Sequence, residues 1–175
     1  MNNPFTDLKN FDDLREVKSK KKKFMILLLG DKKFALPLSL VREVIAPPPL
    51  TLLPHMPSYF TGVVNLRGKI ISVIHLKKSL SQEDSNPKMM KGKRPCIIIT
   101  DLQGHLFGAL VDDVTEVISV TENQIDLSLN EELQGERAYQ GVLKFSDFSV
   151  APILNVEVAL KIEELKKIHS THIAS

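Results

Sequence analysis

Val41-Arg42-Glu43-Val44-Ile45 reappears further along the chain as Val114-Thr115-Glu116-Val117-Ile118. The same kinds of segment surround both stretches: an apolar hairpin precedes each one, and a Gly-Val opening with a second strand pair follows. The hairpins span residues 24–37 and 96–111, and the second strand pairs span residues 62–76 and 141–156. A repeat of about 70 residues that occurs twice indicates one small β unit that was duplicated and packs against its own copy. Units of this kind hold partners and rarely carry a reaction.

The chain length favours two halves that share one core. The 175 residues fit one compact domain or two small halves. A single barrel of about 70 residues buries little apolar surface, so two halves with a shared core are the more stable arrangement. The apolar fraction of 43% is ordinary for a soluble globular protein. We therefore expect a mainly β molecule.

Composition along the chain divides it into six segments. Residues 1–23 form a polar and basic tail, 24–80 the first β-barrel half, 81–94 a flexible link, 95–154 the second β-barrel half, 155–169 a C-terminal helix and 170–175 a short tail. The link contains Pro and Gly among polar residues, which is typical of a connection between halves. Asn155 can act as the N-cap of the helix. Its apolar stripe at helical spacing comprises Val158, Ile162, Leu165 and Ile168.

Charge and cysteine content restrict the partners and the compartment. A net charge of +2 is too small to indicate binding to nucleic acid or membrane by itself. The local excess from Lys18 to Lys23 is explained by a solvated tail, and the alternative is a contact with an anionic surface such as lipid headgroups. The single cysteine, Cys96, excludes an internal disulfide, the N-terminus lacks a signal pattern, and no apolar run reaches the length of a membrane span. These features predict a cytoplasmic protein.

Patterns for catalysis and metal binding are missing from the sequence. None of the five histidines has a second ligand at metal spacing together with cysteine or carboxylate. The neighbours Asp112 and Asp113 point to opposite sides in a strand or turn, so they do not form an acid–base couple. The chain also lacks a Gly-x-Ser-x-Gly elbow and a glycine-rich phosphate loop. We predict no catalytic, cofactor-binding or metal-binding residues and no enzymatic activity.

The most specific local signal is Gly62-Val63-Val64-Asn65-Leu66-Arg67-Gly68, which precedes an apolar strand. Asn65 and Gly68 suit the tight turn of a hairpin for backbone reasons. At the tip, Arg67 either pairs locally or offers its planar set of donors to a partner. The residues alone leave these two interpretations open.

At this hairpin the sequence resembles the CheW family, the adaptors of bacterial chemotaxis arrays. The segments Phe24 to Ile45 and Val111-Asp112-x-Val114 also match, as does the closing strand with its helix, so the resemblance covers residues 24–168. It implies two five-stranded SH3-like barrels around a shared core, and no catalysis. It implies two partners: the cytoplasmic tip of a chemoreceptor (a methyl-accepting chemotaxis protein) and the regulatory domain of the histidine kinase CheA. Such an adaptor is cytoplasmic and reaches receptor arrays at the inner face of the membrane only indirectly, through the receptors.

The resemblance also implies the residues that contact each partner. The receptor-binding positions are Val41, Glu43, Gly62, Asn65 and Arg67, and the kinase-binding positions are Leu110, Val111 and Val114. Two positions depart from the family pattern: His75 stands where the family usually has Asp, and Asp113 stands where it commonly has Gly. These departures leave open an accessory CheW-like paralogue with an altered preference for its partners.

The sequence leaves two other classes of function open. A small barrel can bind nucleic acid, here through the arm from Lys18 to Lys23. Against this interpretation, the aromatic residues mostly lie inside apolar strands rather than on an exposed platform, and we expect no nucleic-acid partner. An enzyme with a dispersed site would use His75 with Asp112 or Asp113 as the first couple to inspect.

Overall fold

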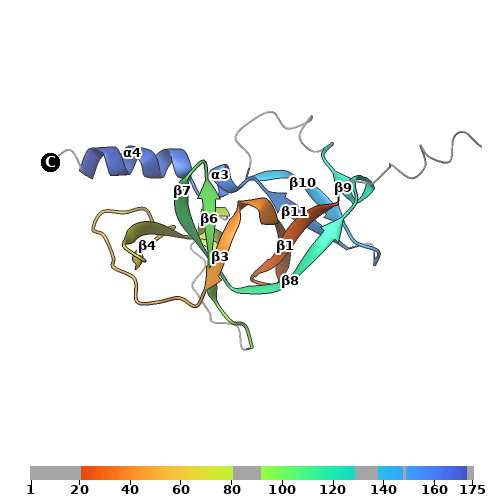
Figure 1. Cartoon of the computed structure of the whole chain (residues 1–175), viewed down its shortest axis with the longest axis horizontal. Coiled ribbons are helices and arrows are strands. Elements are labelled where there is room, and N and C mark those ends of the chain that lie inside the picture. The colour runs from red at the N-terminus through yellow and green to blue at the C-terminus, as the bar shows by residue number, and fades with distance from the viewer. Residues whose placement is uncertain (1–20, 81–91, 129–137, 148, 173–175) are drawn as a thin grey trace, which may run out of the picture.

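Two β-sheets form most of the molecule in a computed structural model (Figure 1), which describes residues 21–80, 92–128, 138–147 and 149–172. Sheet A has the strand order β8-β1-β2-β11-β10-β9, and sheet B has the order β3-β6-β7-β5-β4. The strands of sheet A are β1 (Lys22–Leu29), β2 (Lys32–Pro37), β8 (Asp113–Val120), β9 (Ile125–Asp126), β10 (Tyr139–Lys144) and β11 (Val150–Leu154). Those of sheet B are β3 (Val41–Ile45), β4 (Phe60–Leu66), β5 (Lys69–His75), β6 (Cys96–Leu102) and β7 (His105–Val111).

Short helical segments connect the strands. They are η2 (Leu38–Leu40), α1 (Leu76–Leu80), η3 (Glu122–Gln124), α3 (Val156–Ala159) and α4 (Ile162–His172). The mainly β fold expected from the sequence is confirmed. Residues 1–20 of the predicted tail, 81–91 of the predicted link and 173–175 at the C-terminus lie outside the described residues.

Each sheet combines segments from both copies of the repeat. The hairpin of the first copy, β1 with β2, pairs with β8 and β11 of the second copy. The hairpin of the second copy, β6 with β7, pairs with β3 and β5 of the first copy. The two copies thus exchange hairpins, and both sheets have the same order: an edge strand, a hairpin, and a strand pair joined to the hairpin in parallel.

This exchange differs from the predicted halves 24–80 and 95–154, which the sequence divided in chain order. In the second copy a physical reason lies in the short connection between β7 and β8. Only Asp112 separates β7 from β8, and one residue cannot make the two-residue turn that returns a strand antiparallel to its own hairpin. The chain therefore continues across to the other sheet, where β8 pairs with β1.

The apolar run from Phe24 to Leu29 lacks alternating polar residues, which predicts a strand buried on both faces, and the structure confirms this prediction. In β1, Phe24 and Ile26 face the interior of sheet A, whereas Met25 and Leu27 face a central core between the sheets. The same division occurs in β6, where Ile98 faces the central core and both of its neighbours face the interior of sheet B.

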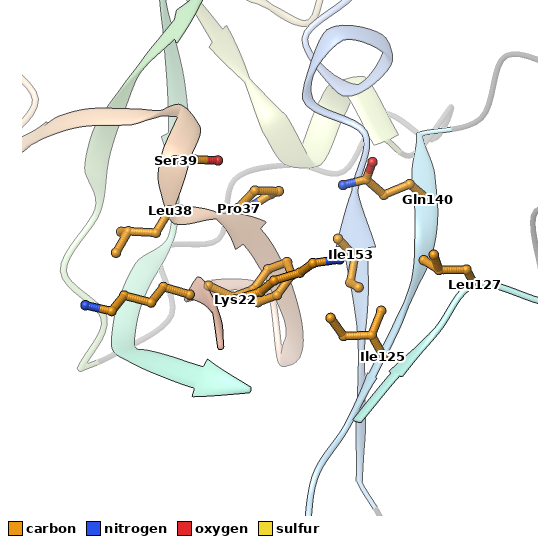
Figure 2. Close-up of a pocket in the computed structure, with 10 residues that line it drawn as sticks. Lys22, Pro37, Leu38, Ser39, Ile125, Leu127, Gln140 and Ile153 are labelled. Atoms are coloured by element: carbon orange, nitrogen blue, oxygen red, sulfur yellow. The ribbon is translucent and has the colours of Figure 1, made fainter. Parts of the chain in front are cut away.

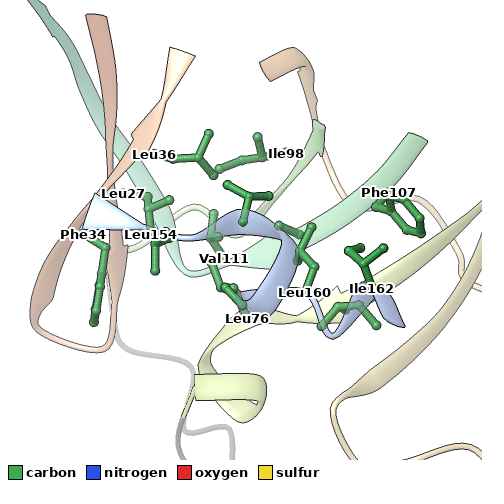
Figure 3. Packing of buried hydrophobic residues seen from close by; sticks show 14 of the residues in the cluster. Leu27, Phe34, Leu36, Leu76, Ile98, Phe107, Val111, Leu154, Leu160 and Ile162 are labelled. Atoms are coloured by element: carbon green, nitrogen blue, oxygen red, sulfur yellow. The ribbon is translucent and has the colours of Figure 1, made fainter. Parts of the chain in front are cut away.

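The central core joins the two sheets and the short helices into one unit (Figure 3). Leu27 and Leu36 come from sheet A, Ile98 and Val111 from sheet B, and Leu160 from the C-terminal segment. Each of these side chains is at most 1% exposed. The shared core expected from chain length is therefore present.

The C-terminal segment forms two helices where the sequence predicted one helix over 155–169. Lys161, with φ of 55°, separates α3 from α4. Leu160 and Ile162 are both buried in the central core. Residues two apart on one continuous helix point about 200° away from each other, so a bend is needed to bury both. The Tyr59 hydroxyl donates a hydrogen bond to the Glu164 carboxylate and fastens α4 to the first copy.

Candidate functional site

The β4–β5 hairpin holds Arg67 at its tip through a two-residue turn. Arg67 and Gly68 both have positive φ, 52° and 84°, the combination of a type I′ turn, whose twist matches that of the flanking strands. The Gly68 N–H donates a hydrogen bond of 2.9 Å to Asn65 Oδ1. Asn65 therefore shapes the turn that carries Arg67, as the sequence indicated, and Asn65 is exposed.

The Arg67 guanidinium is outside the molecule and pairs with Glu43. Its two terminal nitrogens donate to the two Glu43 oxygens at 3.3 and 3.1 Å. Arg67 is 79% exposed and Glu43 is 26% exposed. In the strand order of sheet B, β3 and β4 are opposite edges, so this bidentate pair connects the two edges. Two of the five guanidinium donors are used on Glu43, which leaves others directed to solvent.

Gly62 and Val41 lie on β4 and β3, the strands that lead to Arg67 and carry Glu43. Gly62 is buried, has φ of 150° and lies at a register shift between β4 and β5. A Cβ at this position would lie 2.7 Å from the carbonyl oxygen of Thr51, which itself accepts a hydrogen bond from the Val63 N–H. Val41 is half-buried and packs on the central core. Of the five predicted receptor positions, the structure thus brings Glu43, Asn65 and Arg67 together at the surface.

The predicted kinase positions do not share one face. Val111 is 1% exposed and belongs to the central core, so its side chain stabilises the fold rather than offering a contact. Leu110 is half-buried against the interior of sheet B, whereas Val114 is half-buried against the central core. Only Leu110 and Val114 retain exposed surface.

Among the described residues, His75 makes no side-chain hydrogen bond to Asp112 or Asp113, the couple considered from the sequence. Asp112 Oδ2 accepts a hydrogen bond of 2.6 Å from the Gly30 N–H, and Asp113 Oδ1 accepts one of 2.9 Å from the Val114 N–H. The half-buried His75 has no hydrogen-bond partner for Nδ1 among the described residues. Burial and then the Lys78 charge lower the pKa of His75, while the Asp112 charge opposes this change. Both carboxylates therefore act as hydrogen-bond acceptors for backbone N–H groups.

The described residues contain neither a metal-binding cluster nor a membrane-spanning helix. Within the described ranges, no group of three or more histidine, cysteine, aspartate or glutamate side chains is placed to hold a metal ion. No helix in the same part of the chain is long and apolar enough to cross a membrane. The Cys96 thiol is half-buried, and burial followed by the Asp113 charge raises its pKa.

A cavity of about 570 Å³ opens at one end of sheet A (Figure 2). Its apolar wall includes Ile125, Leu127 and Ile153, and Lys22 and Lys23 lie at its border. It is bordered by segments that continue outside the described residues, at Lys21 and Ser128.

The fold and the hairpin tip define a small β docking module of two interlocked sheets. The chain belongs to the CheW-like domain family, whose model matches residues 23–164. It is 30% identical to the chemotaxis protein CheW of Bacillus subtilis over 135 residues, which cover 77% of this chain and 78% of that protein. It is 34% identical to a probable chemotaxis protein CheW of Rhizobium etli over 97 residues, which cover 55% of this chain and 60% of that protein.

A solved structure shows the same fold. The scaffolding protein TtCheW from Thermoanaerobacter tengcongensis matches with a TM-score of 0.66 and 32% identity, covering 77% of this chain and 89% of that chain. These matches confirm the family resemblance and the expected architecture of two SH3-like subdomains. They support an adaptor role in chemotaxis, within a family of scaffolds.

Proposed function

We propose that this chain joins the cytoplasmic tip of a chemoreceptor to the regulatory domain of the histidine kinase CheA, without catalysing a reaction. The observation that carries the proposal is the exposed Arg67 guanidinium, fixed on Glu43 at the tip of the hairpin that resembles the family most. An arginine that is already oriented loses less conformational freedom on binding than a mobile one. The protein would act in the cytoplasm and reach receptor arrays through the receptor.

The receptor would contact Glu43, Asn65 and Arg67 directly, and Val41 and Gly62 would hold this surface in shape. A helical receptor tip presents an apolar ridge with charges beside it, which suits a surface that combines a charged pair with neighbouring apolar groups. The charges would set register and encounter rate more than affinity. Individually weak contacts would gain strength because many copies act together in an array.

The kinase would contact the region where β7 ends and β8 begins. Leu110 and Val114 are the half-buried apolar side chains there, and Val111 would contribute through the core beneath them. This region and the hairpin tip belong to different elements, so one substitution can weaken one contact and leave the other.

Receptor pull-down with purified components tests the proposal. Arg67→Glu is expected to weaken binding of a soluble receptor-tip fragment by about tenfold, which corresponds to about 1.4 kcal/mol, while binding of the kinase regulatory domain stays unchanged. Arg94→Glu, at an exposed arginine outside the hairpin, is the matched control. Failure of the unmodified protein to bind either partner would remove the basis of the proposal.

A second candidate is an accessory paralogue whose preference for receptor or kinase differs. The observation that favours it is His75 in place of the family's aspartate, with an unpaired Nδ1 among the described residues and a lowered pKa. Competition between this chain and another CheW protein for the same receptor fragment would separate the two candidates. Equal competition at every receptor tested would argue against altered preference.

A further inference from the structure

A groove of about 610 Å³ lies where β5 and β7 begin to pair. It is lined by Lys69, Ile70, Ile71 and Ser72 of β5, by Gly104, His105, Leu106 and Phe107 at the start of β7, and by Lys166 of α4. The parallel ladder between the two strands starts at Ser72 and Phe107. Residues before that pair have no partner across the junction, so the strands separate there and α4 forms the third wall. We call this site the β5–β7 groove.

The charged side chains that line the β5–β7 groove are the two lysines, Lys69 and Lys166. No carboxylate lines it, and His105 is the other titratable side chain there. Lys69 makes no ion pair with the residues that the structure describes. Lys166 pairs with Glu163 at 3.1 Å one turn away on the surface of α4, a type of contact that contributes little and can be exchanged for another carboxylate. The groove therefore suits an anionic occupant.

The equivalent groove in sheet A has a different character. It lies at the parallel junction of β2 and β11 and measures about 450 Å³. Asp31 and Asp147 line it together with Lys32 and Lys33, so the charges balance within the groove itself. The comparison shows that the parallel junction alone does not produce a basic groove. The excess positive charge is a property of the β5–β7 groove.

The β5–β7 groove is continuous with the surface around Arg67. Lys69 follows the Arg67-Gly68 turn directly, and Ile70 lies opposite Asn65 in the β4–β5 register. Ile70, one of the residues that line the groove, is 63% exposed, so a large apolar side chain lies next to the turn that carries Arg67. A partner that lies against the tip would therefore meet Ile70 and Lys69 next.

We propose that the β5–β7 groove binds an acidic segment with one apolar anchor in the same chemoreceptor tip that contacts Arg67; this inference rests on the proposed function. Carboxylates of the segment pair with Lys69 and Lys166 at the border. The anchor packs on Ile70 and Leu106, where apolar contact supplies affinity and the lysines supply orientation. The receptor footprint is then wider than the hairpin tip and extends to the C-terminal helix.

Titration of the full chain with a soluble coiled-coil fragment of a receptor tip tests this inference. Lys69→Glu is expected to raise the Kd about fivefold at low salt and less at high salt, because the contact is exposed and screened. Ile70→Ser is expected to raise the Kd by a similar factor at both salt concentrations, because an apolar contact is not screened. Lys32→Glu, which reverses a lysine of the equivalent groove in sheet A, is the matched control and is expected to bind as the unmodified chain does.

Amide chemical-shift mapping of the same complex gives a second measurement. Shifts at residues 69–72 and 104–107 together with the hairpin tip support the inference. If shifts occur at the tip alone and Lys69→Glu and Ile70→Ser have normal Kd values, the inference that the groove binds the receptor is overturned. The proposed function is then left intact. No binding by the unmodified chain overturns both. Binding to phosphatidylglycerol vesicles that Lys69→Glu abolishes, without any groove shifts on adding the receptor fragment, would assign the groove to lipid and overturn a protein occupant.

Discussion

The two copies of the repeat build the same framework and differ at its surface. Gly62 and Gly141 both have φ of 150° and both lie at a register shift. The Thr51–Val63 bridge beside β4 corresponds to β9 beside β10. α1 and α3 follow the two strand pairs and meet each other, where the Ser79 hydroxyl donates a hydrogen bond of 2.5 Å to the Ala159 carbonyl.

The difference concerns two equivalent glutamates on the two edge strands. Glu43 on β3 holds the guanidinium of Arg67, whereas Glu116 on β8 has no ion pair within the described part of the chain. The turn after β10 carries no arginine in its place: Ser146-Asp147 stand there. Shared positions thus maintain the sheets, and the unshared Arg67 adds a charged pair to the first copy, on the surface that we propose binds the receptor.

The largest expected effects come from the two equivalent glycines. Gly62→Ala would place Cβ 2.7 Å from the Thr51 oxygen, and Gly141→Ala would place it 2.6 Å from the Asp126 oxygen. Because both positions also have positive φ, each substitution is expected to lower the free energy of unfolding by about 2 to 4 kcal/mol in urea titrations. Gly104→Ala is the control, since it shares positive φ but its Cβ meets open space, and about 1 kcal/mol is expected. A large effect at only one of the two glycines would break the structural equivalence.

The second-largest effect on stability is expected at the aspartates that accept hydrogen bonds from the two hairpin turns. Asp112 of the second copy accepts the Gly30 N–H of the first copy at 2.6 Å, whereas Asp101 accepts the Gly104 N–H of its own hairpin at 2.9 Å. Asp112→Ala is expected to cost about 1 to 3 kcal/mol because a partly buried donor loses its partner. Asp101→Ala, at an exposed turn, is expected to cost about 0.5 kcal/mol. Equal urea midpoints for the two variants would contradict the assignment of Asp112 as a link between copies.

A pH dependence distinguishes His75, the last residue of β5, from Asn155, the N-cap residue of α3. Each of them directly precedes the helix that follows the strand pair of its copy. Their N–H groups make equivalent bonds, to the Tyr59 and Ala138 carbonyl oxygens. Burial lowers the pKa of His75 below its ordinary 6.5, so the unfolded chain binds a proton more readily. Neutral His75 therefore makes its full contribution to the free energy of unfolding above the pKa of the unfolded chain. This contribution declines as pH falls through 6.5 toward the lower pKa of the folded protein.

The variant His75→Asn introduces asparagine, the residue found at the equivalent position 155 of the second copy, into the first copy. Urea midpoints at pH 7.5 and 5.5 are expected to differ less in this variant than in the unmodified chain. An unchanged difference between the two midpoints would show that His75 is not the group responsible.

The smallest effect on stability is expected at the two glutamates. Glu43→Ala and Glu116→Ala should each change the free energy of unfolding by less than about 0.5 kcal/mol, since an exposed ion pair contributes little. Receptor binding should separate them: Glu43→Ala releases Arg67 from its fixed orientation and is expected to weaken binding about threefold to fivefold, and Glu116→Ala is expected to leave it unchanged. Equal binding by both variants would mean that the orientation of Arg67 does not matter.

Local patterns in the sequence predicted the hairpins but not their partners. The uninterrupted apolar run from Phe24 to Leu29 predicted a strand buried on both faces, because neither face can carry polar residues. Which sheet receives β8 depends on a one-residue connection at Asp112 and on contacts far apart in the chain, and no local pattern records such a choice. The sequence also did not predict the bend at Lys161, because no glycine or proline occurs there.

The candidate site shows the same limit. Residue type and turn chemistry placed Arg67 at a hairpin tip, and the family resemblance named Glu43. Their pairing could not be predicted, because it joins opposite edges of a sheet whose strand order was unknown. Val111 was assigned to a partner surface and is buried, because adjacent apolar residues such as Leu110 and Val111 give no periodic signal for which one points inward.

The exchange of hairpins has a consequence for how this chain can be divided. A cut between residues 80 and 92 would give two fragments, each with an edge strand, a strand pair and a hairpin whose sheet belongs to the other fragment. Neither piece holds a complete sheet, so each is expected to remain unfolded alone and to recover structure only when both are mixed. In this respect the protein resembles an obligate heterodimer whose two subunits are tethered end to end.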